Sequence, residues 1–317
     1  MTIRPIMLVD AMNVFVRCYC AFPSMSTHGY QAGGTVGFLK TLRKLINDHN
    51  PSSVYVVWEG GGSKKRRDLY SDYKATRRPE KLNRFYEDDI PDTDENKIQQ
   101  ISIVAKLIRC LPVCQLYVKD CEGDDVIAYL SRYVFDKEQK IIISGDRDFY
   151  QLMNDRTVIY SPNKKRIVKP QDVLDEFRIS CANFAMAKSL CGDVSDNIPG
   201  VKGLGFKTLT KRFPFFASDE QIMIDDIVNF CNAHTKESSI YPKVVENLEL
   251  IKRNWQLIYL DASSIAPVQI EQIKYAVNTF KPSVSKIGFI KHLISEGLTD
   301  FEVDNFFYTF LCLNTQS

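Results

Sequence analysis

The sequence has no apolar run that approaches the ~18 to 20 residues of a membrane-spanning helix. Its first apolar stretch, "PIMLVD", is short and ends in an acid, so no secretory signal peptide is expected either. These absences argue against a membrane protein and against a secreted one. We therefore expect a cytoplasmic protein.

Paired metal-binding cysteines are also missing. The nine cysteines include no C-x2-C pair and the four histidines do not cluster with them, which argues against a zinc site. Cys110 and Cys114 are expected to be buried thiols in a reducing compartment. The chain also lacks a Ser–His–Asp pattern and a G-x-x-x-x-G-K-[ST] loop, so serine-hydrolase and P-loop chemistry are not indicated.

An excess of charge of one sign is absent from the chain as a whole but present in one segment. The formal net charge is only +2 over 317 residues, and the 44% apolar composition predicts a folded core. Residues 64–86, however, carry nine Lys or Arg against three acids, together with several aromatic side chains. We interpret residues 64–95 as an excursion that does not join the main core.

Short apolar runs alternate with helical patterns along the first half of the chain. The runs lie at 5–10, 53–59, 113–120, 140–146 and 157–162, and the helical patterns at 34–49, 96–111 and 123–135. This alternation predicts an α/β domain over residues 1–170, with a central, mostly parallel sheet and helices on both faces. Beyond it the pattern is mostly helical, so we expect a helical region over residues 171–317.

The first four of these runs each lead into an acid, at the edge where open α/β sheets bind ligands. The candidate acids are Asp10, Glu59, Glu122, Asp124, Asp125, Asp146, Asp148, Asp193 and Asp196. Each alone reads as an ordinary turn or helix-capping acid. Brought together, they cannot all stay ionised without cations. Oxygen ligands suit Mg²⁺ or Mn²⁺, and two such ions about 4 Å apart could clamp the attacking and leaving oxygens of a phosphodiester.

The stretch "GDVSDNIPGVKGLG" (192–205) adds two of these acids to a glycine-rich connection. We predict a helix–hairpin–helix over residues 184–213, in which Gly200, Gly203 and Gly205 let a phosphate backbone approach closely. Positive charge along the bound strand would come from Lys202, Lys207, Lys211 and Arg212. A motif of this kind holds a duplex by its backbone and does not read sequence. The alternative is an ordinary connection between two helices.

Five blocks, in this order and spacing, make the chain resemble the 5′-nuclease or flap-endonuclease family. They are "LVDAMN" (8–13), "RRDLYSDYKATR" (66–77), "CEGDDVIA" (121–128), "SGDRDFYQL" (144–152) and "GDVSDNIPGVKGLGFKT" (192–208). The chain is most similar to free-standing bacteriophage members of the ribonuclease H type and to the 5′-nuclease domain of bacterial DNA polymerase I. The resemblance covers roughly residues 1–215 and implies a PIN-like fold with a helical arch.

The resemblance assigns roles to individual residues. It implies that the candidate acids bind two Mg²⁺ or Mn²⁺ ions, although Glu59 stands where the family usually has Asp and the role of Asp125 is less defined. Lys74 and Arg77 would contact the scissile phosphate, so the catalytic set is Lys74, Arg77, Asp10 and Asp124. Predicted DNA contacts outside the hairpin are Arg17, Lys64, Lys65, Arg66 and Tyr73. A monovalent cation is expected at the hairpin.

The activity that the resemblance implies is metal-dependent 5′-3′ exonuclease and flap-endonuclease cleavage near junctions of single and double strand. The expected role is removal of RNA primers or flaps during DNA replication, in the host cytoplasm if the source is viral. Two rivals remain: a PIN-type ribonuclease and a non-catalytic protein that binds DNA junctions. The glycine hairpin argues against the first, and the intact acid set argues against the second.

Expected partners are branched or nicked DNA and RNA/DNA duplex with a 5′ end, bound by a monomer, with no membrane. A sliding clamp or a single-strand-binding protein is a further candidate partner. "DFEVDNFF" (300–307) has the spacing of a clamp-binding box, with Val303, Phe306 and Phe307 as anchors. An amphipathic core helix explains the same run equally well.

Overall fold

The computed structural model describes residues 4–75, 94–299 and 301–313. Arg77 and most of the predicted arch lie outside these residues. Where the chain is described, no helix is long and apolar enough to cross a membrane. Cys110 and Cys114 are buried, as predicted.

A six-stranded sheet forms the centre of the molecule, with strand order β3-β2-β1-β4-β5-β6. The strands are β1 (Ile6–Asp10), β2 (Ser53–Trp58), β3 (Cys114–Tyr117), β4 (Lys140–Ile143), β5 (Thr157–Ser161) and β6 (Arg166–Val168). All neighbouring pairs are parallel except β5 and β6, which are antiparallel. The predicted mostly parallel sheet is confirmed. The short β6 was not predicted.

Both faces of the sheet are buried, which explains why its strands are apolar at successive positions. In β1, Leu8 joins one hydrophobic core, while Met7 and Val9 join the other. Alternate side chains of a strand point to opposite faces, so a run with no polar residue must be covered twice. The second core lies under α1 (Ala11–Ala21), α2 (Gly33–His49) and α4 (Asp94–Ile108), and the first under α5 (Gly123–Tyr129).

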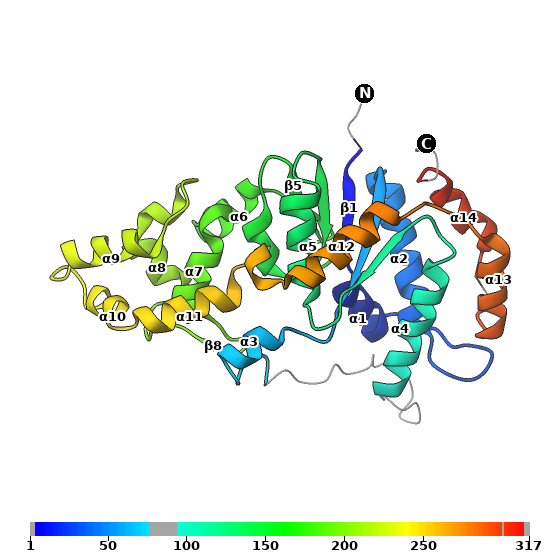
Figure 1. Ribbon diagram of the computed structural model, residues 1–317, viewed down its shortest axis with the longest axis horizontal. Coiled ribbons are helices and arrows are strands. Elements are labelled where there is room, and N and C mark those ends of the chain that lie inside the picture. The colour runs from blue at the N-terminus through cyan, green and yellow to red at the C-terminus, as the bar shows by residue number, and fades with distance from the viewer. Residues whose placement is uncertain (1–3, 76–93, 300, 314–317) are drawn as a thin grey trace.

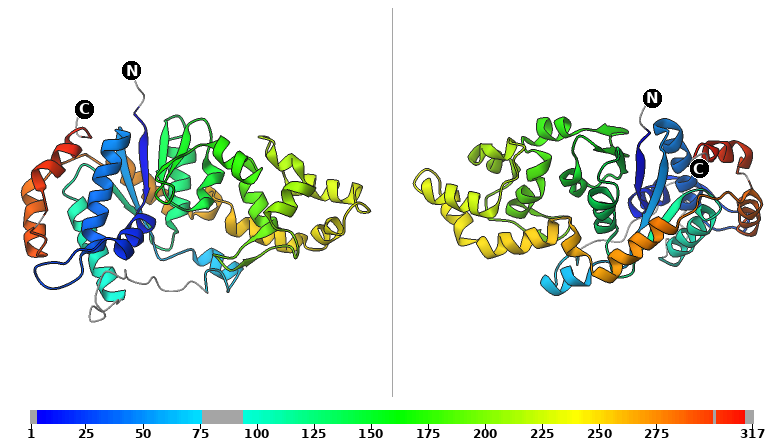
Figure 2. Two further views of the ribbon diagram at one scale, coloured as in Figure 1. Left: turned by 180° about the vertical axis from the view of Figure 1, so that it is seen from behind. Right: turned by 45° about the horizontal axis from the view of Figure 1, so that its top comes forward.

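Helices after the sheet extend to one side of it, as Figures 1 and 2 show. They are α6 (Pro170–Phe177), α7 (Phe184–Cys191), α8 (Phe206–Arg212), α9 (Ile224–Ala233), α10 (Ile240–Glu246) and α11 (Leu248–Ile258). A two-stranded ladder of β7 (Gly192–Asp193) and β8 (Ile198–Pro199) lies between α7 and α8. Helix α11 packs against both α7 and α3 (Lys64–Leu69), which places the hairpin region beside the start of the predicted arch.

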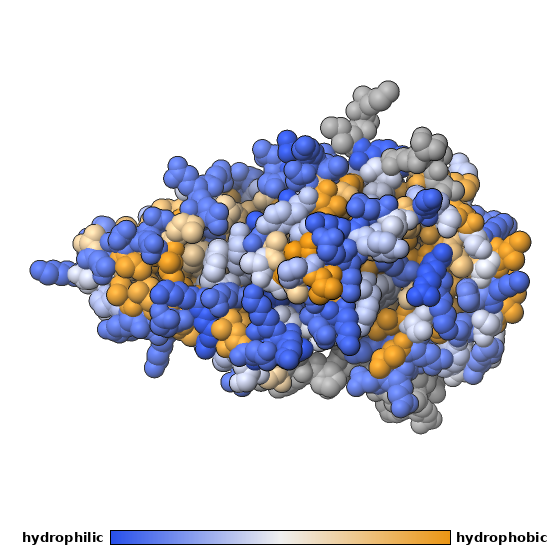
Figure 3. Space-filling view, viewed as in Figure 1, coloured by the Kyte–Doolittle hydropathy of each residue, from blue (hydrophilic) through white to orange (hydrophobic). Residues whose placement is uncertain are grey.

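The last helices return to the sheet. After α12 (Pro267–Thr279), which packs on β3, the chain forms α13 (Lys286–Ser295) against α4 and α14 (Val303–Leu311) against α2 (Figure 1). These three helices of the predicted helical region over residues 171–317 therefore contact the α/β layer. On the face drawn in Figure 3, hydrophilic side chains cover most of the surface, as expected when the apolar residues fill two cores.

The proposed clamp anchors belong to this packing. Phe306 and Phe307 are 1% and 5% exposed, and both rings contact Phe289 of α13. A clamp-binding box needs its aromatic anchors free to enter a partner's pocket, and these two are already in the core. Residues 303–307 of this run are thus better explained by the amphipathic core helix that was its alternative, and Asp300 lies outside the described residues.

Replacing Phe306 tests this packing. We expect Phe306→Ala to lower the free energy of unfolding by about 3–5 kcal/mol, because it leaves a cavity among packed rings. Tyr308→Ala is the matched control: its side chain is 78% exposed, so its effect should stay within about 0.5 kcal/mol. Urea unfolding of both variants measures the difference. Equally small effects would show that α14 does not stabilise the core.

Candidate active site

The carboxyl ends of β1 and β4 hold the first acids of the site. Asp10 ends β1 and caps α1, accepting a hydrogen bond from the Asn13 N–H at 3.1 Å. After β4, the Ser144 hydroxyl donates to Asp10 Oδ2 at 2.9 Å, and the Gly145 N–H donates to Asn13 Oδ1 at 2.9 Å. These bonds tie the two strand ends together, so Asp10 and Asp146 lie close enough to interact electrostatically.

Glu59 follows β2 on the same edge of the sheet. Its Oε1 accepts a hydrogen bond from the Gly62 N–H at 2.9 Å, and its Oε2 accepts one from the Gly123 N–H at 3.2 Å. Burial raises the pKa of this carboxyl, and Glu122 adds to the rise. Both oxygens are thus engaged by the backbone, which favours a contact to metal through water over direct ligation.

Glu122 has more hydrogen-bond donors than any other acid of this edge within the described chain. Its carboxylate accepts from Lys74 Nζ at 2.8 Å, the Tyr73 hydroxyl at 3.0 Å and Arg66 Nη1 at 3.1 Å, and from the Ser63 N–H. Burial alone would raise the pKa of Glu122, but Lys74 and Arg66 hold it below its usual value. This residue stays ionised and fixes the basic segment to the site.

Arg66 and Tyr73 were predicted to contact DNA, and the structure places them elsewhere. Their side chains are buried, at 3% and 6% exposure. Arg66 binds Asp125 through both guanidinium ends, at 2.6 and 2.8 Å, as well as Glu122. A basic residue in a basic segment is expected to be exposed, but Arg66 is buried because it pairs with the buried acids Asp125 and Glu122. Asp125, 1% exposed and paired in this way, is likewise a partner of Arg66 and not a member of the open acid cluster.

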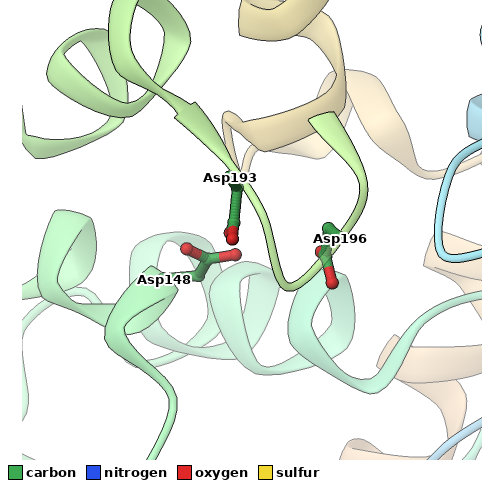
Figure 4. A group of neighbouring side chains, drawn as sticks. All are labelled: Asp148, Asp193 and Asp196. Atoms are coloured by element: carbon green, nitrogen blue, oxygen red, sulfur yellow. The ribbon is translucent and has the colours of Figure 1, made fainter. Parts of the chain in front are cut away.

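Three acids from two separate elements form the most compact group. Asp148 lies in a 3-10 helix (Arg147–Leu152) after β4, and Asp193 and Asp196 lie on the hairpin after α7. One oxygen of each carboxylate lies within 4.8 Å of the others. In Figure 4, Asp148 and Asp193 face each other and Asp196 approaches across the hairpin loop. The hairpin thus brings two acids next to Asp148.

The acids carry the electrostatic strain expected of a metal site. Burial, with a smaller contribution from their acidic neighbours, raises the pKa of Asp10 and of Asp148 to about 6. Burial and the nearby Asp146 raise the pKa of Asp124 well above its usual range. Each of eight carboxylates lies close to at least one other carboxylate of the group, and every ligand atom that they offer is an oxygen. The donors, on Asp10, Glu59, Glu122, Asp124, Asp146, Asp148, Asp193 and Asp196, fit hard divalent ions such as Mg²⁺ or Mn²⁺.

We expect magnesium affinity to fall as pH drops through about 6, because Asp10 and Asp148 must be deprotonated to bind it. The gain in melting temperature from a fixed, subsaturating Mg²⁺ concentration should therefore be smaller near about pH 5 than near about pH 7.5. In EDTA we expect the opposite trend, with a melting temperature that falls as pH rises through about 6. The reason is that carboxyls with a raised pKa contribute less to stability once they are ionised. Melting curves in Mg²⁺ and in EDTA at each pH measure both effects. An equal gain at both pH values would contradict this assignment.

Lys74 lies inside the cluster. Its ammonium contacts Glu122 and lies 3.9 Å from Asp196 Oδ2, and its backbone N–H donates to the Asp196 carbonyl at 3.0 Å. Burial alone would lower the pKa of Lys74, but Glu122 and its other acidic neighbours raise it, so the group stays charged. The predicted catalytic lysine is thus next to the acids. Arg77 lies outside the described residues.

The three hairpin glycines differ in their surroundings. A Cβ on Gly200 would lie 2.1 Å from the backbone of Cys191, so this glycine is required for close packing of the hairpin and not for approach of DNA. Gly203, with φ of 88°, and Gly205, which caps α8, have open space where a Cβ would lie. Lys202, Lys207 and Lys211 are exposed beside them. Gly205 also borders a cleft of about 570 Å³ that reaches Asp146, Asp148 and Asp193.

Three further predicted DNA contacts are exposed. Arg17 donates to the Asn163 side chain of the β5–β6 hairpin, and Lys65 donates to the Ser263 carbonyl at 2.8 Å. Lys64 is exposed at the start of α3. Their positions are compatible with the predicted role, which remains a prediction.

Lys188 is the residue of this site that sequence reasoning missed. Its ammonium contacts Asp148 and lies 2.5 Å from Asp193 Oδ2. Burial opposes the charge, but the two carboxylates raise the pKa of Lys188 above the ordinary lysine value. The available signal was a single charged residue in the otherwise uncharged helical stretch "FAMAKSLC".

Comparisons with known proteins agree with this geometry. A family model described as the 5′-3′ exonuclease, N-terminal resolvase-like domain, matches residues 5–178. Thermostable DNA polymerase I of Thermus thermophilus is 29% identical over 220 residues, which are 69% of this chain and 25% of the polymerase. A 5′-3′ exonuclease of Aquifex aeolicus is 27% identical over 222 residues, 69% of this chain and 72% of that protein.

Among solved structures, a variant of the phage T5 D15 flap endonuclease in complex with DNA and metal ions has the same fold. Its TM-score is 0.64 at 19% identity, covering 99% of this chain and 100% of that one. The chain spans about a quarter of the polymerase that it matches. The family model covers more than half of the 317 residues and includes all the strand-end acids. The chain belongs to the 5′-3′ exonuclease family.

Proposed function

We propose that the chain is a divalent-metal-dependent 5′-3′ exonuclease and structure-specific flap endonuclease that cuts phosphodiesters near junctions of single and double strand. One observation carries the proposal: eight carboxylates converge at one edge of the sheet, with the Lys74 ammonium bonded among them. A protein that only binds DNA gains nothing from burying acids where phosphates must approach. The family to which the chain belongs supports the same conclusion.

The residues of the cluster would divide the work. A bound divalent ion supplies Lewis acidity, which lowers the pKa of water and stabilises negative charge on the phosphodiester. Asp10, Asp124, Asp146, Asp148 and the acids of the hairpin would hold two such ions. Lys74, and Arg77 from the arch segment, would contact the scissile phosphate and stabilise its transition state. Arg66 and Tyr73 would act indirectly, because they orient Glu122.

The hairpin would hold the duplex on the far side of the cleft. Gly203 and Gly205 leave room for a phosphate backbone, and the exposed Lys202, Lys207 and Lys211 supply positive charge next to them. The monovalent cation expected at this hairpin belongs to the same proposal. Contacts of this kind do not read sequence, so we expect recognition by shape.

The proposed substrates are branched or nicked DNA and RNA/DNA duplexes with a 5′ end, bound by a monomer. The proposed role is removal of RNA primers or flaps during replication. A single-strand-binding protein or a sliding clamp stays a candidate partner, but the packing of Phe306 and Phe307 argues against the box at 300–307 as the contact.

A 5′-labelled flap duplex, incubated with Mg²⁺ or with EDTA, tests the proposed function. We expect cleavage near the junction in Mg²⁺ only, leaving a 5′-phosphate on the downstream product. Single-stranded RNA of the same sequence is the comparison substrate. Preferential cutting of the RNA would favour a PIN-type ribonuclease, and tight flap binding without cleavage would favour a junction-binding protein.

A further inference from the structure

Lys188 occupies an unusual place for a lysine. It lies on α7, is 8% exposed, and is the one charged side chain of that helix. Its ammonium bridges Asp148, in the 3-10 helix after β4, and Asp193, on the hairpin after α7. Within the part of the chain that the structure describes, no other lysine or arginine forms an ion pair with either acid. Lys188 therefore provides the charge compensation for this end of the cluster.

The same oxygens are those that a divalent ion would use. Asp148 and Asp193 are two of the three acids whose carboxylate oxygens gather within 4.8 Å. The Lys188 ammonium donates to Oδ1 of Asp148 and pairs with Oδ2 of Asp193. The remaining Asp193 oxygen accepts hydrogen bonds from the Ser195 N–H at 2.9 Å and from the Ser195 hydroxyl at 2.6 Å. An ion that binds Asp148 and Asp193 directly must compete with the ammonium for their lone pairs.

We propose that Lys188 is an internal counter-ion that occupies the position of one divalent ion and withdraws from it when that ion binds. The proposal rests on metal binding by the acid cluster, which is part of the proposed function. It makes Lys188 a positioning residue: it keeps Asp148 and Asp193 together in the metal-free protein and sets how tightly the ion is held.

The surroundings allow such a withdrawal. Lys188 borders the cleft of about 570 Å³, whose walls include Phe184, Phe206 and Gly205. A lysine side chain has four rotatable bonds, so its ammonium can turn into this space while its stem stays packed in α7. At the opposite end of the cluster Lys74 pairs with Glu122, but that acid is also held by Arg66 and Tyr73. Removing Lys188 leaves Asp148 and Asp193 with no ion-pair partner among the described residues, although Ser195 still donates to Asp193.

Two readings of Lys188 make opposite predictions. If the lysine competes with the ion, replacing it with a neutral side chain strengthens metal binding. If it only stabilises the fold, the same replacement destabilises the metal-free and metal-loaded protein alike and leaves affinity equal or weaker. Lys188→Met separates them, because methionine has a similar unbranched stem and no charge.

The experiment is calorimetric titration of the metal-free protein with Mg²⁺ in the absence of DNA. We expect Lys188→Met to bind one Mg²⁺ about tenfold or more tightly than the unmodified protein, within the ~5- to 150-fold range usual for coupling between two bound groups. Lys274→Met is the matched control, since it removes an exposed lysine whose partner is Glu271 on α12. Its Mg²⁺ affinity should equal that of the unmodified protein.

Melting temperatures provide the second readout. Lys188→Met should melt lower than the unmodified protein in EDTA and gain more from Mg²⁺. If this variant does not fold without metal, Lys188→Arg keeps the charge and should retain the weaker affinity. Unchanged or weaker Mg²⁺ binding by Lys188→Met would overturn the proposal. If the variant needs metal to fold, it is purified with Mg²⁺ before its affinity is measured. Tighter Mg²⁺ binding in a protein that cuts no flap would contradict the nuclease function and leave the counter-ion role standing.

Discussion

Asp124→Asn is expected to lose most flap cleavage, about 10²-fold or more in single-turnover rate, while its affinity for flap DNA stays within a few-fold. The reason lies in the charge of the site. Burial and the nearby Asp146 already raise the pKa of Asp124 well above its usual range, so its ionised form depends on a bound cation. Asparagine keeps the shape but offers a neutral oxygen, and removing negative charge does not weaken attraction to phosphates.

Asp120→Asn is the matched control for this experiment. It makes the same chemical change four residues earlier, at an exposed position with φ of 56°, a backbone conformation that asparagine tolerates. Its cleavage rate and DNA affinity should match those of the unmodified protein. Normal turnover of Asp124→Asn in Mg²⁺ would remove Asp124 from the active site.

Lys74→Ala and Lys207→Ala should separate chemistry from DNA binding. Lys74 is bonded inside the acid cluster, so its loss should lower the single-turnover rate at saturating protein by about 10²-fold or more. Lys207 is exposed on α8, so its loss should weaken binding, reduce the salt dependence by about one phosphate contact and leave the saturated rate nearly unchanged. A charge that acts on the transition state affects rate, and one that acts on the ground state affects affinity.

One flap substrate, titrated at several salt concentrations and then followed over time with excess protein, measures both effects. Because the Lys74 ammonium also supports Glu122, the melting temperature of Lys74→Ala in Mg²⁺ is recorded alongside. If the two variants change the single-turnover rate and the DNA affinity in the same way, the assignment of catalysis to the acid cluster and of DNA binding to the hairpin is wrong.

Much of the site could be predicted from the sequence, because many of its acids directly follow strands of a parallel sheet. Parallel strands bring their carboxyl ends to one edge, so acids that follow apolar runs meet there, as Asp10 and Asp146 do. The hairpin acids were grouped with them because of their residue type and were supported by the block resemblance, since nothing local says that residues 193 and 196 fold back over Asp148. The structure brings these three together.

What the sequence could not give is the direction in which a charged side chain points. Arg66 stands in a run of four basic residues, yet it alone of that run is buried, because Asp125 and Glu122 lie beneath it. Lys188 was missed for a different reason. Its neighbours in the sequence are apolar, so the pattern predicts a buried helix without a functional side chain. The amphipathic pattern of α14 predicted a buried face but not that the face packs on α2, which lies more than 250 positions away in the chain.

The dependence of flap cleavage on Mg²⁺ concentration tests the central claim most directly. Single-turnover rates would be measured on one 5′-flap duplex from EDTA through saturating Mg²⁺. A cluster that holds two ions predicts no cleavage in EDTA and, below saturation, a rate that rises with about the second power of Mg²⁺ concentration. Cleavage that persists in EDTA at the full rate, or no cleavage at any Mg²⁺ concentration, would contradict the account.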